Sequence, residues 1–215
     1  MHWKTILCCA LTGLAARSSF GCTEVMLPKA GTDWVSMRTM DYPIPLHSEV
    51  IVEPQGQNWT SAAPEDSLKA VCWTNHYGFV GINALGARQY PEAMNEKGLS
   101  VATLVLPGTQ YCSPDGKKPV LEICDIGAFL AGQCATVPEV RALLDSVEVW
   151  GGVHPLLGEQ IQLHVVVHDA EGRCLVVEWL NGRAHLHDDP IGVCTNAPEL
   201  PAQWANLNHY AALSP

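Results

Sequence analysis

Cys22 follows a short apolar leader that ends Ser19-Phe20-Gly21. Removal of this leader would leave a cysteine as the first residue of the chain. A cysteine in that position carries a thiol and a free α-amine on one framework, and the amine titrates near pH ~7.7–8. The amine can therefore act as general base for its own side chain. The position of Cys22 thus predicts an amide hydrolase that uses an N-terminal nucleophile.

Residues 1–21 have the pattern of a secretory signal peptide. Lys4 supplies a positive charge, residues 5–16 are mostly apolar, and Ser19 and Gly21 are the small residues expected before a cut. The apolar stretch is shorter than the ~20 residues of a membrane-spanning helix. We therefore expect an exported protein, secreted or periplasmic, whose mature chain begins at Cys22.

Two other interpretations of the leader remain open. In a lipoprotein signal the cysteine after the cut is lipidated and its amine is often acylated, which would remove the base. Lipoprotein signals prefer a large aliphatic residue where Ser19 stands and a small one where Phe20 stands, so the match is poor. A cut elsewhere would make Cys22 an ordinary residue.

Composition limits the classes of function. The 215 residues allow one globular domain with a good core, and the net charge of −10 argues against binding nucleic acid or an anionic membrane. Six cysteines besides Cys22 follow the leader, and they fit either disulfides or buried free thiols. They are Cys72, Cys112, Cys124, Cys134, Cys174 and Cys194.

The periodicity of the chain predicts strands, then helices, then strands and a last helix. The first strands cover residues 35–41, 48–53, 70–73, 78–82 and 100–106, with 70–73 paired to 78–82. Helices follow over 119–132 and from a Thr136 cap to 147. Later strands cover 160–168, 173–180, 183–187 and 192–195, and a helix covers 198–210. This order predicts an α+β fold of antiparallel sheets with helices layered on them.

Four segments follow Cys22 in a fixed order. They are Ser36-Met37-Arg38-Thr39-Met40-Asp41, Met94-Asn95-Glu96-Lys97-Gly98-Leu99, Val165-Val166-Val167-His168-Asp169-Ala170-Glu171-Gly172, and Gly192-Val193-Cys194-Thr195-Asn196-Ala197-Pro198 with Asn206-Leu207-Asn208. From Cys22 to about Tyr210 the set closely resembles the choloylglycine hydrolase (bile salt hydrolase) and penicillin V acylase family. The resemblance implies the αββα sandwich of the N-terminal-nucleophile (Ntn) hydrolases and hydrolysis of linear amide C–N bonds.

The resemblance also implies roles for single residues. Cys22 is the nucleophile, Arg38 lies near its sulfur, and Asp41 holds the α-amine. Asn196 matches an asparagine whose side-chain amide donates to the oxyanion, and the backbone N–H of Val105 matches the second donor. Family members often carry Asn or Tyr where Val105 stands, but a main-chain donor does not depend on the side chain.

The sequence departs from the family pattern near its end. Family members carry a further catalytic arginine downstream of the Asn196 region and run well past this length, whereas no arginine follows Arg183 here. The expected organisation is therefore a signal peptide over 1–21 and an Ntn-hydrolase domain over 22–215 that is truncated at its C-terminus. Activity without that arginine is in question.

The resemblance implies a small-molecule N-acyl amide as substrate: a conjugated bile salt, penicillin V or an N-acyl lactone. It also implies a homotetramer and no cofactor. The contrary hypothesis is a lipid-anchored or truncated domain that binds an acyl ligand without turnover. His164 and His168 would share a face of one strand, but histidines in sheets are more often structural than metal ligands, so we expect no metal.

Overall fold

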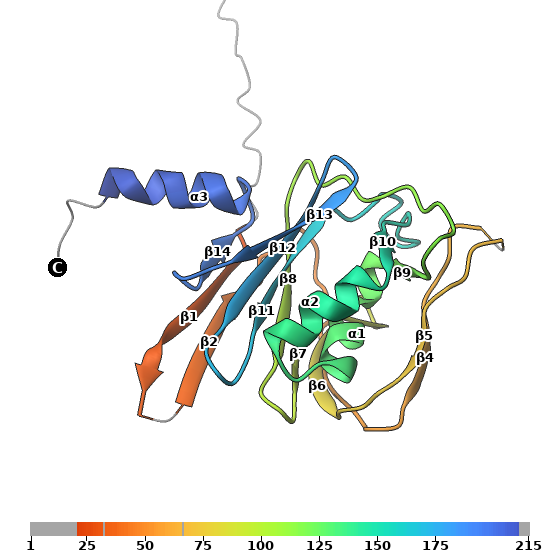
Figure 1. Cartoon of the computed structure of the whole chain (residues 1–215), viewed down its shortest axis with the longest axis horizontal. Helices are drawn as coiled ribbons and strands as arrows, with labels where there is room; N and C mark the ends of the chain where they lie inside the picture. Colours follow the sequence, from red (N-terminus) through yellow and green to blue (C-terminus); the bar gives the residue numbers. More distant parts are fainter. Residues whose placement is uncertain (1–20, 32, 66, 211–215) are drawn as a thin grey trace, which may run out of the picture.

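The computed structural model describes residues 21–31, 33–65 and 67–210 (Figure 1). Apart from Gly21, the predicted signal peptide lies outside the described residues. No helix in the described ranges has the length and apolar character needed to span a membrane.

A seven-stranded antiparallel sheet forms the centre of the fold, in the order β13-β12-β11-β8-β7-β6-β3 (Figure 1). Its strands are β3 (Val50–Glu53), β6 (Phe79–Ala84), β7 (Ala87–Asn95), β8 (Ser100–Val105), β11 (Leu163–His168), β12 (Cys174–Leu180) and β13 (Arg183–Asp188). Side chains alternate between its two faces. Val101 and Val165 belong to the core on one face, whereas Ala102 and Val166 belong to the core on the other.

Two helices cover the first face, α1 (Ile126–Gln133) and α2 (Val137–Asp145). α2 begins as the sequence predicts, because the Thr136 hydroxyl accepts a hydrogen bond from the Glu139 N–H. The 3₁₀ turn η1 (Ile123–Asp125) precedes α1. Two short sheets lie beside these helices: the parallel pair β9 (Val120–Glu122) and β10 (Glu148–Trp150), and the antiparallel pair β4 (Asn58–Thr60) and β5 (Cys72–Thr74).

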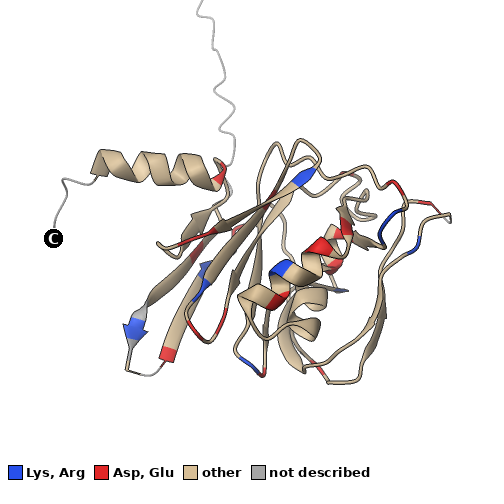
Figure 2. Ribbon diagram, in the orientation of Figure 1, with Lys and Arg blue, Asp and Glu red and all other residues tan. Residues whose placement is uncertain are grey.

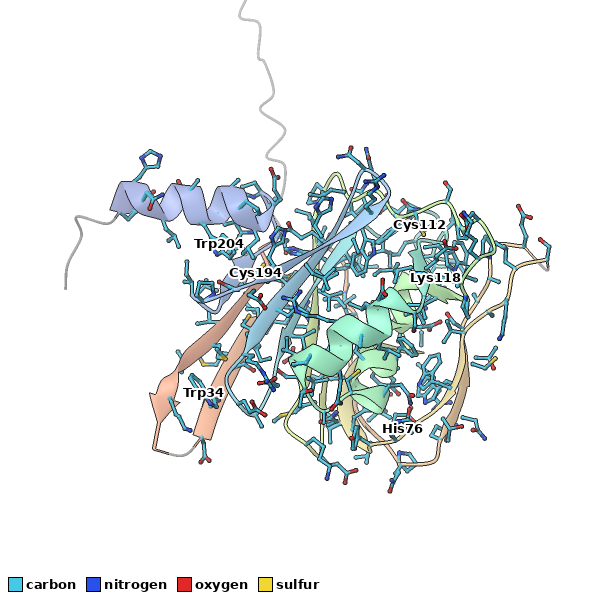
Figure 3. All side chains as sticks on the ribbon, viewed as in Figure 1. Trp34, His76, Cys112, Lys118, Cys194 and Trp204 are labelled. Carbon is cyan, nitrogen blue, oxygen red and sulfur yellow. The ribbon has the colours of Figure 1, made fainter. Side chains whose placement is uncertain are left out.

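A three-stranded sheet packs on the second face. Its order is β14 (Val193–Thr195), β1 (Thr23–Ala30) and β2 (Asp33–Thr39). The core between the sheets contains Cys22, Leu104 and Val176, each 3% exposed or less. α3 (Leu200–Leu207) and the 3₁₀ turn η2 (Asn208–Tyr210) follow β14, and Trp204 lies on the side of α3 that faces the sheets (Figure 3). We call the space between the two sheets the inter-sheet layer.

The inter-sheet layer also buries ionisable groups. His168 Nε2 lies 3.2 Å from Glu24 Oε1, and His164 Nδ1 lies 3.4 Å from Glu178 Oε1. All four residues are at most 5% exposed, and each imidazole lies beside a carboxylate. Among the described residues no group of three or more His, Cys, Asp or Glu side chains is arranged to hold a metal ion. His164 and His168 therefore act as internal partners of buried carboxylates.

The predicted sequence of strands, helices and strands is present, but two predictions are wrong. Residues 119–132 do not form one helix, because Val120–Glu122 is the strand β9, paired with β10, and α1 begins only at Ile126. The stretches at 70–73 and 78–82 do not pair with each other: β5 pairs with β4, and β6 pairs with β3 and β7.

The described chain carries few basic residues, and its cysteines are not bonded to one another. Apart from the adjacent Lys117 and Lys118, the basic positions along the described ribbon are separated in sequence (Figure 2). All seven cysteines of the described chain are free thiols, which selects one of the two alternatives that the sequence leaves open. Burial raises the pKa of Cys194 to about 12 and also raises the pKa of Cys174, so both stay protonated near neutral pH.

Candidate active site

Cys22 directly precedes β1 and is only 3% exposed. Its sulfur lies 3.9 Å from Nη2 of Arg38 and 4.0 Å from the carbonyl oxygen of Asp41. The antiparallel pairing of β1 with β2 brings these residues together, because Glu24 lies opposite Arg38 and Cys22 is two residues from Glu24 on the same face. Cys22 and Arg38 therefore both face the inter-sheet layer.

The Arg38 guanidinium fills a gap between β7 and β8. Pro91 has no N–H to give to a ladder, and β7 pairs with β8 only from Glu92 onward. Nη1 of Arg38 donates to the Pro91 carbonyl at 2.6 Å, and Nη2 donates to the Thr103 carbonyl on the other strand. The guanidinium thus bridges the two strands where their own hydrogen bonds stop, and its side chain is 2% exposed.

Glu92 is the nearest counter-charge to Arg38, with Oε2 at 3.8 Å from Nη1. Burial raises the pKa of Glu92 above its ordinary range, the Arg38 charge acts against this rise, and Glu24 adds to it. The positive charge of Arg38 is therefore shared between this carboxylate, two strand carbonyls and the sulfur of Cys22.

The free edge of β8 also directs a backbone donor toward the site. The N–H of Leu106 donates to the Gln162 carbonyl at 2.9 Å, so Val105 occupies a non-hydrogen-bonded position against β11. In an antiparallel ladder the N–H and C=O of such a residue point to the opposite edge of the strand. The Val105 N–H therefore points away from β11, toward the edge of β8 that is no longer paired with β7. The Thr103 carbonyl points to the same edge.

Asn196 and Asp41 lie beside Cys22 without lining its pocket. Thr23 of β1 pairs with Thr195 of β14 in antiparallel register. Asn196, the residue after Thr195, therefore falls opposite Cys22, the residue before Thr23. Asp41 presents its carbonyl to the sulfur, and its side chain is exposed. Cys22 is still joined to Gly21 in this chain, so its nitrogen is an amide. The predicted contact between Asp41 and a free amine stays a prediction.

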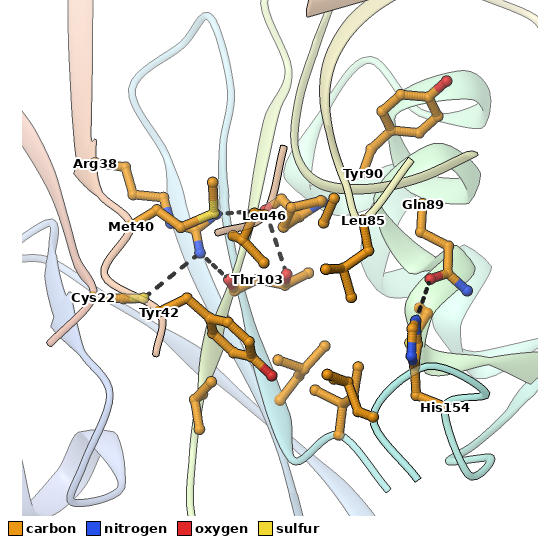
Figure 4. A pocket seen from close by; sticks show the side chains of 17 residues that line it. Cys22, Arg38, Met40, Tyr42, Leu46, Leu85, Gln89, Tyr90, Thr103 and His154 are labelled. Carbon is orange, nitrogen blue, oxygen red and sulfur yellow. Dashed lines mark hydrogen bonds between the residues drawn. The ribbon is translucent and has the colours of Figure 1, made fainter. Parts of the chain in front are cut away.

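Cys22, Arg38 and Val105 line one pocket (Figure 4). Its walls are mainly apolar and come from loops and strands far apart in the sequence: Met40, Leu46, Leu85, Leu157, Ile161 and Leu163. Figure 4 places the sulfur and the guanidinium on one side and His154 with Gln89 on the other, with Leu46 and Leu85 between them. The pocket therefore suits an apolar group placed beside the Cys22 sulfur.

Two polar side chains of the pocket have fixed surroundings. His154 Nδ1 accepts from the Leu156 N–H at 3.3 Å, so its Nε2 carries the proton and donates to Gln89 Oε1 at 3.2 Å. Burial raises the pKa of Tyr42, and the charge of Glu159 adds to that rise. The Tyr42 hydroxyl therefore stays protonated near pH 7 and adds no charge to the pocket.

Pro91, Glu92 and the pocket walls were not predicted from the sequence. A proline within a strand was a usable signal for a broken ladder. The wall residues carry no local signal, because they are ordinary apolar residues that only the tertiary fold brings together.

The profile of the linear amide C–N hydrolases, choloylglycine hydrolase family, matches residues 22–215. The chain belongs to the choloylglycine hydrolase family. The family match begins at Cys22, the residue whose sulfur faces the Arg38 guanidinium.

Named relatives fit this assignment. The chain is 32% identical to a bile salt hydrolase/transferase of Lactiplantibacillus plantarum over 184 residues, which are 82% of this chain and 53% of that protein. It is 28% identical to a penicillin V acylase of Pectobacterium atrosepticum over 212 residues, 94% of this chain and 55% of that protein. The chain thus spans about half the length of the curated relatives it matches.

A solved structure gives the same result for the fold. The penicillin V acylase of Agrobacterium tumefaciens superimposes with a TM-score of 0.79 at 25% identity, over 90% of this chain and 58% of that one. The α+β fold of the Ntn hydrolases, expected from the sequence, is confirmed.

Proposed function

We propose that the mature chain, beginning at Cys22, hydrolyses the linear amide bond of a small N-acyl compound. The observation that carries the proposal is the position of the Cys22 sulfur, in the wall of an apolar pocket and 3.9 Å from a buried guanidinium. A fixed positive charge at this distance favours the thiolate, which is the nucleophilic form of cysteine.

Attack begins when the α-amine, freed by removal of residues 1–21, accepts the proton of the Cys22 thiol. The sulfur then bonds to the carbonyl carbon of the amide, whose oxygen becomes an oxyanion. The Val105 N–H and the Asn196 side-chain amide are the proposed donors to this oxyanion, and one such donor is worth about 2.7–4 kcal/mol. The Asp41 carboxylate is proposed to hold the amine in place.

Collapse of this intermediate breaks the C–N bond. The leaving nitrogen takes the proton from the α-ammonium and departs as an amine, while the acyl group stays on Cys22 as a thioester. Water, deprotonated by the same amine, then attacks the thioester. The products are a carboxylic acid and the regenerated thiol.

The apolar walls of the pocket support an apolar acyl group as the part of the substrate bound beside Cys22. Conjugated bile salts, penicillin V and N-acyl lactones all carry such a group on an amide, and two of these substrates occur in the names of the matched relatives. We propose this class, with no cofactor in the reaction, and a homotetramer as the assembly.

The first test replaces the nucleophile. Cys22→Ser is expected to abolish hydrolysis of a panel of these three amides by the processed protein. Cys72→Ser is the matched control, because Cys72 is an exposed thiol on β5 away from the pocket, and it should keep wild-type rates. Unchanged hydrolysis in Cys22→Ser would refute the nucleophile assignment.

The second test concerns processing and location. Mass spectrometry of protein recovered from the periplasm or the medium should find Cys22 at the N-terminus with a free amine. A diacylglyceryl group on the sulfur, or a first residue other than Cys22, would favour the lipid-anchored or non-catalytic alternative.

A further inference from the structure

The segment that carries Asn196 lies beyond the end of a strand. β14 has only three residues and ends at Thr195, and Ala197, Pro198 and Glu199 are exposed. Sheet hydrogen bonds therefore do not fix the backbone on the far side of Asn196. An oxyanion donor needs a fixed position, because its contribution depends on where the charge develops.

One side chain ties both ends of this segment together. Gln203 Oε1 accepts from the Thr195 N–H at 3.0 Å, while Nε2 of Gln203 donates to the Thr195 carbonyl at 3.2 Å and to the Pro198 carbonyl at 2.6 Å. These residues lie immediately before Asn196 and two positions after it. A single amide thus spans the donor residue.

The helix that carries Gln203 is itself anchored. Leu200, at its first position, is fully buried in the inter-sheet layer, and its N–H donates to Glu178 Oε1 at 2.8 Å. Trp204 Nε1 donates to Asp189 Oδ1 at 3.2 Å. The amide of Gln203 is therefore held from the central sheet, since Glu178 lies on β12.

The chemistry of the three contacts requires an amide. A glutamate at 203 would keep the acceptor for the Thr195 N–H but would set a carboxylate oxygen against two carbonyls. A leucine would fill similar space and make none of the three hydrogen bonds. Only glutamine supplies one acceptor and two donors from the end of a side chain of this length.

We propose that Gln203 is the positioning residue of Asn196. It acts through the backbone of residues 195–198 and does not touch the reacting atoms. The proposal rests on the amide hydrolysis proposed above, in which Asn196 stabilises the oxyanion. Loss of the Gln203 amide should therefore lower the rate of the chemical step and leave ground-state binding of the substrate unchanged.

The test compares wild type, Gln203→Leu, Gln203→Glu and the control Asn206→Leu, which alters an exposed residue on the same helix. In both Gln203 variants kcat should fall 10- to 100-fold with KM within about twofold, as expected for an interaction made in the transition state. Binding of an acyl aldehyde, which forms an oxyanion-like adduct with Cys22, should weaken in parallel. The rate of Cys22 alkylation by iodoacetamide should not change.

Hydrogen exchange gives a readout that needs no turnover. Peptides covering residues 194–199 should exchange faster in Gln203→Leu than in wild type or Asn206→Leu, while peptides from β8 and β11 keep their protection. Unchanged exchange in this segment would show that the Gln203 amide does not hold the backbone of residues 195–198, whatever the activity of the variant. A wild-type protein that neither hydrolyses the amides nor binds the aldehyde refutes the proposed function instead. The positioning role is refuted if Gln203→Leu keeps the wild-type kcat. It is also refuted if KM and the rate of Cys22 alkylation change as much as kcat does.

Discussion

The Arg38 guanidinium is enclosed between two strand carbonyls, and its Nη2 is directed toward the Cys22 sulfur. Arg38→Gln removes the charge and is expected to slow alkylation of Cys22 by iodoacetamide at pH 7 about tenfold, which corresponds to about 1.4 kcal/mol. The alkylation rate of Arg38→Lys should lie between those of wild type and Arg38→Gln. An ammonium keeps the charge but lacks the planar guanidinium that reaches both carbonyls and the sulfur. Mass spectrometry of the Cys22 peptide measures the rate.

A matched control for this experiment is Arg141→Gln. Arg141 lies on α2 and pairs with Asp188 at the surface, so its charge should not influence Cys22. Equal alkylation rates for wild type and Arg38→Gln at pH 7 would show that the guanidinium does not activate the sulfur.

The position of Cys22 after the leader predicted the nucleophile, the family resemblance predicted Arg38, and the structure brings the two side chains together. Both belong to motifs that are local in sequence, and two paired strands suffice to join them. Pro91 and Thr103 were not predicted, because their contribution is a pair of backbone carbonyls that any residue type carries. Val105 was predicted by resemblance, and the ladder register gives its N–H a physical reason to point toward the pocket.

At the scale of elements, Glu122 connects the end of β9 to a pocket loop. It is 8% exposed and accepts hydrogen bonds from the N–H groups of Cys124 at 2.7 Å and Gly152 at 3.3 Å. Burial raises the pKa of Glu122 from 4.5 to about 7. The folded protein therefore keeps a proton that the unfolded chain loses from pH 4.5 upward, so stability should fall as the pH rises through this window.

Glu122→Gln tests this linkage. Between pH 4.5 and 7, wild type should lose on the order of 3 kcal/mol of unfolding free energy that Glu122→Gln does not lose. Urea unfolding at a series of pH values measures the difference. Glu65→Gln, in an exposed loop, should follow the wild-type curve. Parallel curves for wild type and Glu122→Gln would mean that the pKa of Glu122 is the same in the folded and unfolded states.

The errors in the predicted elements have a physical cause. Val120, Leu121 and Glu122 are buried, and a short buried strand has no period that separates it from a helix. The Thr136 cap was predicted correctly because its hydrogen bond is local. Strand pairing is not local: β6 follows a turn-prone stretch after β5 but pairs with β3 and β7, and only packing of the whole sheet selects those partners.

At the scale of the whole molecule, the three-stranded sheet covers only part of the facing sheet. The hydrophobic core between the two sheets contains residues of the seven-stranded sheet from β8, β11 and β12 only. On β3, β6 and β7 the same face is apolar and open to solvent, with exposed fractions of 70% for Val50, 72% for Val52, 45% for Val80 and 55% for Met94. Within the described chain β3 is also an edge strand.

An exposed apolar edge strand favours pairing between molecules. Val52→Lys is therefore expected to lower the concentration-dependent self-association of the purified protein, measured by light scattering. Its thermal midpoint and the alkylation rate of Cys22 should stay unchanged, because Val52 contributes to neither the inter-sheet core nor the pocket. Val153→Lys is the matched control, a 69% exposed valine in a loop outside the sheet. If both variants scatter like wild type, this sheet face does not drive association; a fall in both would point to net charge rather than the β3 edge.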